Sequence, residues 1–130
     1  MGTTRRRPAT IATTLAATAR DLRLVVRAAD AGQPPGLPQL RDVGWQLTQL
    51  TGELTDLVAL LADHTGHHTR RPEHLRQVEG APATAHLAAA CRELATLRRT
   101  LDTAHTAARD YYTELSRLTT AAPGPLRPAP

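Results

Sequence analysis

The chain has no lysine, asparagine or phenylalanine, and it has one cysteine, one serine and one tryptophan in 130 residues. Because Cys91 has no second thiol to pair with, a disulfide within the chain is excluded, and nothing indicates an oxidising compartment. Ser116, the only serine, stands in no nucleophile motif. All 16 basic side chains are arginines, a bias that a GC-rich genome produces by itself, so the arginine excess alone does not indicate a function.

Long apolar runs are also missing from the sequence. A membrane span needs about 18 or more continuous apolar residues, and no segment of the chain has them. Residues 1–19 faintly resemble an export signal, since a basic cluster precedes an Ala/Thr stretch, but four threonines interrupt the apolar part. We therefore expect a cytoplasmic protein without a membrane-spanning segment.

The formal net charge is +4, and most of it is concentrated at the start of the chain. Arg5, Arg6 and Arg7 account for +3 of this charge, whereas the segment 37–63 is net negative. This distribution does not predict a continuous basic face of the kind that follows a phosphate backbone. Residues 1–8 have no apolar stripe to bury, so we expect them to form a disordered basic arm.

Three segments carry apolar residues at alternating three- and four-residue steps, the spacing that keeps a stripe on one side of an α-helix. They predict helices at about residues 9–31, 38–65 and 83–121. The connectors are too short for crossovers, so the sequence predicts an all-α fold, an antiparallel three-helix bundle with heptad-like (coiled-coil) packing. The second stripe is the most regular, and its members are Leu40, Val43, Leu47, Leu50, Leu54, Leu57 and Leu61.

Proline and glycine mark the ends of these helices. The segment 32–38 contains three prolines and two glycines and cannot be helical. We expect Gly66 to end the second helix, and a proline start with a glycine stop predicts a short fourth helix within residues 66–82. Residues 123–130 contain four prolines and predict a disordered tail. One helical-bundle domain, residues 9–122, remains.

The two ends of the predicted bundle differ in chemistry. Folding the second and third helices back on each other places Leu40 beside Ala108 and gathers five of the histidines at the opposite end from the aromatic residues. The third helix should be longer than the second, about 58 Å against about 42 Å at 1.5 Å per residue. Its C-terminal turns would then overhang and leave Leu115 and Leu118 in water, so we expect a homodimer through this end.

The histidine end offers a weak candidate for a metal site. His64 and His68 are four residues apart, the spacing with which one helical face holds a divalent ion, and His67 could join them. However, Gly66 lies between them and the sequence has neither a di-iron nor a zinc-protease pattern. Histidines near a helix C-terminus also stabilise its exposed carbonyls. We therefore assign no metal and no cofactor, and keep these three residues as candidates only.

The aromatic end is the better lead to a partner. Trp45 lies beside Gly44 on a Thr/Gly-rich surface, which is typical of an exposed binding anchor; alternatively, it fills a second seam of a middle helix that contacts two neighbours. Tyr111 follows the apolar stripe of the third helix, and Tyr112 points elsewhere. The candidate partner-binding residues are Trp45, Tyr111, Tyr112, Leu115 and Leu118.

No catalytic arrangement can be recognised in the sequence, so the favoured function is that of a non-enzymatic interaction or scaffold protein. It would self-associate as a dimer or dock a partner protein. The alternative is an accessory nucleic-acid-binding protein that uses an N-terminal arginine arm and a basic loop at residues 70–76. The arginines of that alternative are Arg5, Arg6, Arg7, Arg70 and Arg71.

Overall fold

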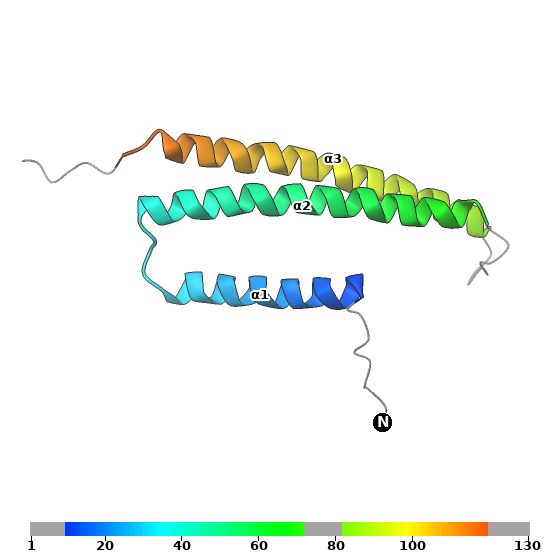
Figure 1. The fold of residues 1–130 in the computed structure, drawn as a ribbon, viewed down its shortest axis with the longest axis horizontal. Coiled ribbons are helices and arrows are strands. Elements are labelled where there is room, and N and C mark those ends of the chain that lie inside the picture. Colours follow the sequence, from blue (N-terminus) through cyan, green and yellow to red (C-terminus); the bar gives the residue numbers. More distant parts are fainter. Residues whose placement is uncertain (1–9, 72–81, 120–130) are drawn as a thin grey trace, which may run out of the picture. The chain divides into compact units, whose positions relative to one another are not determined.

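The computed structural model describes residues 10–71 and 82–119, and over these ranges the chain forms three α-helices and no strand (Figure 1). Helix α1 spans Ile11–Ala31, α2 spans Leu37–Thr69 and α3 spans Ala83–Ser116. The prediction of an all-α fold is confirmed. The predicted basic arm, the Pro-rich tail and most of the predicted fourth helix lie outside the described residues.

The helix ends follow from local chemistry. The Thr10 hydroxyl accepts a hydrogen bond from the backbone N–H of Thr13 at 3.0 Å and so caps the start of α1. At the other end of α1, the N–H of Gly32 donates to the carbonyl of Ala28 at 3.1 Å. Helix α2 has Pro38 in its first turn, where the missing amide hydrogen costs nothing.

Helix α2 does not end at Gly66. It continues to Thr69, and the N–H of Arg70 closes it by donating to the carbonyls of His67 and His68. A single interior glycine costs only about 1 kcal/mol relative to alanine, too little to stop a helix of 33 residues. Conversely, α3 ends at Ser116, five residues before the predicted end at 121.

The chain divides into two compact units, residues 1–35 and residues 36–130. The first unit contains α1, whose apolar side chains are all exposed, for example Leu15 at 39% and Val25 at 63%. The second contains α2 and α3, which pack against each other along their length as an antiparallel pair (Figure 1). The packing of the first helix in a three-helix bundle stays a prediction.

The seam between α2 and α3 is built from small side chains. On α2 it contains Gly44, Thr48 and Val58, the three residues of this helix that are buried. The Thr48 hydroxyl donates to the carbonyl of Gly44 at 2.9 Å, so its burial leaves no polar group without a partner. Thr55 and Thr65 bond in the same way to carbonyls four residues earlier, at 3.0 and 2.8 Å.

Gly44 sets how closely the two helices approach. A Cβ atom at this position would lie 3.1 Å from Cδ1 of Tyr111 and 3.4 Å from the Cα atom of Tyr112. By contrast, a Cβ atom at Gly66 would meet nothing within 4 Å. Gly44 and Gly66 are therefore a matched pair for comparing substitutions, since both lie inside α2 but only Gly44 lies in the seam.

We predict that Gly44→Leu unfolds at a markedly lower temperature than the wild type, because the added side chain must push Tyr111 and the α3 backbone away. In Gly66→Leu, the gain in helix propensity of up to about 1 kcal/mol should raise or preserve the midpoint. Circular dichroism at 222 nm during heating measures both. Equal effects of the two substitutions would contradict the close contact at Gly44.

Candidate interaction surfaces

The leucine stripe of α2 lies beside the seam rather than in it. Because each residue turns an α-helix by about 100°, Leu47 lies about 60° to one side of the row through Gly44, and Trp45 about 100° to the other side. Val43 and Leu47 are accordingly 47% and 42% exposed, while the other five members of the stripe are half-buried. The buried contact with α3 is made by Gly44, Thr48 and Val58, so part of the apolar surface of the stripe remains open on one side of the hairpin.

Helix α3 has a matching division into two sides. His105 and Tyr112 contact Gly52 and Trp45 of α2, which places these four residues on the same side of the pair. The row of α3 on the opposite side is apolar. We define the leucine face as this row together with the α2 stripe: Leu40, Val43, Leu47, Leu50, Leu54, Leu57 and Leu61 of α2, and Ala90, Leu97, Ala104 and Tyr111 of α3.

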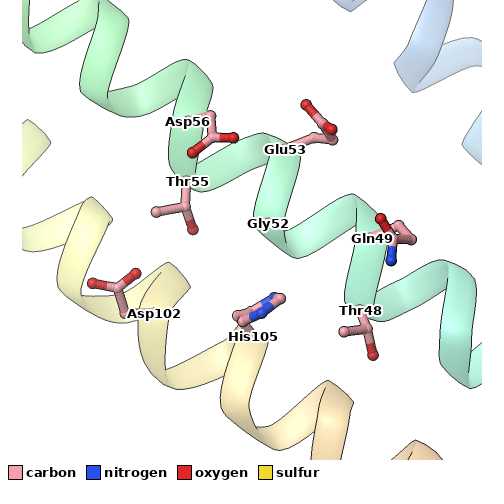
Figure 2. Close-up of a pocket in the computed structure, with 8 residues that line it drawn as sticks. All are labelled: Thr48, Gln49, Gly52, Glu53, Thr55, Asp56, Asp102 and His105. Carbon is pink, nitrogen blue, oxygen red and sulfur yellow. The ribbon is translucent and has the colours of Figure 1, made fainter.

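The other side of the pair, the polar face, contains a shallow hollow centred on His105 (Figure 2). Its ring Nδ1 lies 3.1 Å from the Thr51 hydroxyl oxygen. That hydroxyl has one hydrogen, which is directed at the carbonyls of Leu47 and Thr48 at 2.9 and 3.0 Å. Where the Thr51 hydroxyl donates to one of these carbonyls, Nδ1 can donate to the hydroxyl oxygen.

Carboxylates and threonine hydroxyls line this hollow together with the histidine. The lining residues are Thr48, Gln49, Gly52, Glu53, Thr55, Asp56, Asp102 and His105. Figure 2 shows Asp102 and His105 extending from α3 toward α2, while Glu53 points away from α3. The three carboxylates make the hollow suited to holding a polar or cationic group.

A second hollow on the polar face is lined by Asp42, Trp45, Gln46 and Tyr112. The Trp45 and Tyr112 rings pack with their centroids 5.4 Å apart and their planes tilted by 57°. Trp45 is nevertheless 48% exposed. Trp45 thus contacts α3 and is also partly open to solvent, and its role as a binding anchor stays a prediction.

Arg41 caps the C-terminus of α3. Its Nε donates to the carbonyl of Leu115 at 3.2 Å, and its Nη2 donates to the carbonyl of Leu118 at 2.6 Å. The Leu115 carbonyl also accepts from the backbone N–H of Leu118 at 3.1 Å, and Leu118 itself lies two residues beyond the end of α3. The side chain thus ties the start of α2 to the end of α3, and this contact could not be predicted because it joins residues 74 and 77 positions apart.

The structure overturns the predicted register and the overhang. Gly44 lies against Tyr111 and Arg41 reaches Leu115, so the register that placed Leu40 beside Ala108 is wrong by about two helical turns. Helices α2 and α3 have 33 and 34 residues, and α2 extends past the end of α3 at this side. Leu115 is half-buried and Leu118 is 53% exposed beyond the helix end, so up to residue 119 α3 forms no helical overhang past the start of α2.

The three candidate metal ligands lie on the continuous last turns of α2. His64, His67 and His68 are all exposed, and the ring centroids of His67 and His68 are 6.0 Å apart. Within residues 10–71 and 82–119, no group of three or more histidine, cysteine or acidic side chains is placed to hold a metal ion.

The arginines of the nucleic-acid alternative are only partly described. Arg70 and Arg71 are exposed just after α2, whereas Arg5, Arg6 and Arg7 lie outside the described residues. Neither Arg70 nor Arg71 lines either hollow of the polar face. Arg70 lines a separate hollow at the end of α2, together with Asp63, His64 and His67. The nucleic-acid alternative stays a prediction.

Comparison of the chain with protein-family models, with curated proteins and with solved structures gave no match. Among the described helices, none is long and apolar enough to cross a membrane. The two faces of the α2–α3 pair are therefore the candidate functional surfaces of the described chain.

We predict that Arg41→Ala lowers the free energy of unfolding by about 1 kcal/mol, because two carbonyls of the α3 terminus lose a charged donor that is partly exposed to water. Arg117 provides the control, since its only ion pair, with Glu114, joins two side chains that are 69% exposed. Arg117→Ala should change stability by less than about 0.5 kcal/mol. Urea titrations measure the free energy of unfolding of both variants. An equal decrease in the two would show that the contact of Arg41 with α3 does not contribute to stability.

Proposed function

We propose that this protein is a non-enzymatic helical interaction module that self-associates through the leucine face. The observation that carries the proposal is that α2 uses different residues on different sides. Its small buried residues contact α3, and its leucine stripe lies to one side of that contact. The pair therefore presents its largest apolar surface outward instead of enclosing it.

The interior of the α2–α3 pair is too small to stabilise the pair by itself. Within the described residues, Val58 is the only hydrophobic side chain that is buried. One such side chain contributes about 1.5 to 3 kcal/mol, whereas ordering the backbone costs about 1 to 2 kcal/mol per residue. A second layer of structure is needed to bury the remaining leucines, as in other layered domains.

The leucine face is large enough for a stable interface. Two helices of 33 and 34 residues present a strip of about 50 Å by about 20 Å, or about 1,000 Å². A standard protein interface buries about 800 Å² on each partner. The face therefore exceeds what one stable dimer contact requires.

A second copy of the chain can cover this face with its own leucine face. With a twofold axis along the hairpin, α2 of one copy lies over α3 of the other at the same height. The Gly52 to His105 contact fixes those heights and brings Leu47, Leu54 and Leu61 of one copy near Tyr111, Ala104 and Leu97 of the other. Apolar side chains of both copies would then meet along the face, as in the core of a helical bundle. The expected product is a dimer in which α2 and α3 of both copies form a four-helix core.

The test is the mass in solution at about 50 µM, measured by light scattering. We predict that the wild type has twice the chain mass of 14.0 kDa and that Leu47→Glu is monomeric, because a charge in the interface cannot be desolvated. Gln49→Glu introduces the same charge on the polar face of α2 and should stay dimeric.

Circular dichroism of the same samples separates loss of assembly from loss of folding. If Leu47→Glu is unfolded as well as monomeric, Leu97→Glu on α3 provides a second disruption of the face, and it should likewise abolish the dimer. A monomeric wild type, or a Leu47→Glu variant that remains dimeric, contradicts self-association through this surface.

A further inference from the structure

We infer that Trp45, Tyr112 and Asp42 form a binding site for an arginine side chain presented by a partner protein. This site lies on the polar face of the hairpin. It is independent of the leucine face and does not require the proposed dimer.

The aromatic part of the site is held in place by the helix contact. Gly44 allows α3 to approach α2, and this approach brings the Tyr112 ring to 5.4 Å from the Trp45 ring. The tilt of 57° between the two planes leaves an aromatic surface open to solvent, since Trp45 remains 48% exposed. A ring face of this kind attracts a cation, most strongly when the ring is tryptophan.

The negative charge of the Asp42 carboxylate also favours a cationic ligand. Asp42 precedes Trp45 by three residues, the separation that places two side chains side by side on a helix, and both line the same hollow. Within the described residues the only ion pair is that of Arg117 with Glu114, so Asp42 has no cationic partner there. Glu53, Asp56 and Asp102 in the neighbouring hollow add negative potential along the same face.

The geometry favours arginine over lysine. A guanidinium is planar, so it can stack on the Trp45 ring while its edge donates two hydrogen bonds to the Asp42 carboxylate. An ammonium is a strongly hydrated point charge that can satisfy only one of these contacts well. The amide of Gln46 supplies a further acceptor at the rim of the hollow. Nearby Arg41 does not compete, because it donates to the carbonyls of Leu115 and Leu118.

The site contains its own reporter, because Trp45 is the only tryptophan in the chain. The full-length protein is titrated with the peptide acetyl-Gly-Arg-Gly-amide while Trp45 fluorescence is recorded. The same peptide with citrulline in place of arginine has nearly the same shape without the charge. We predict a saturable change with the arginine peptide, and an affinity at least tenfold lower with citrulline and severalfold lower with lysine.

Two variants test the assignment of the site. Asp42→Asn should weaken the arginine peptide at least fivefold, because the site loses the carboxylate that accepts from the guanidinium. Asp30→Asn removes an exposed acid from α1 and provides the control for the change in net charge. Absence of a saturable change up to 10 mM peptide, equal binding of the citrulline peptide, or equal weakening by Asp42→Asn and Asp30→Asn would each overturn the inference.

Discussion

The close approach of α2 and α3 at Gly44 is the constraint on which the rest of this structure depends. A Cβ atom there would lie 3.1 Å from the Tyr111 ring and 3.4 Å from the Tyr112 Cα atom, so even a methyl group requires the Tyr111 ring to shift slightly and a large side chain requires the helices to move apart. Gly44 thus lies between two adjacent tyrosines that diverge to opposite sides of the pair. Thr48 continues the small row, and its hydroxyl is satisfied within its own helix, so it packs as a small side chain without a polar cost.

This small seam determines what the two sides of the hairpin display. Gly44 and Thr48 form the contact surface of α2 at this point. The leucine stripe of α2 therefore lies beside the contact, where it forms the leucine face together with the apolar row of α3. On the other side, the same approach brings Tyr112 to Trp45 and His105 to Gly52. The leucine face and the polar face therefore both result from the close packing of α2 against α3.

Periodicity in the sequence was sufficient to predict the all-α fold, the three helices and the antiparallel direction of α2 and α3. It was not sufficient for the seam, because a pattern of hydrophobic residues assigns the contact to leucines and gives no weight to a row such as Gly44 and Thr48. The end of α2 was misplaced for a related reason: Gly66 was read as a stop, although one glycine costs a long helix little.

The candidate site was predictable only in part. The exposed ring of Trp45 and its place at one end of the pair followed from its position on the helix, but its contact with Tyr112 required the register, which the predicted helix ends did not give. Arg41 could not be found at all. Its partners are the backbone carbonyls of Leu115 and Leu118. Every residue has such a carbonyl, so the residue type does not indicate which one a distant arginine will contact.

Because the seam between α2 and α3 is built from small residues and the leucine face points outward, the stability of the folded pair depends on what covers that face. The direct contact of α2 with α3 specifies direction and register through the fit at Gly44 and the cap by Arg41, but it buries a single hydrophobic side chain, Val58, in the described residues. Most of the apolar surface that can stabilise the helices is left for whatever covers the leucine face. Any group that binds the folded pair and not the unfolded chain adds its binding free energy to stability. The composition of this chain, rich in threonine and alanine and without phenylalanine, suits such an arrangement, because it gives a geometrically specific hairpin that gains most of its stability from its partner.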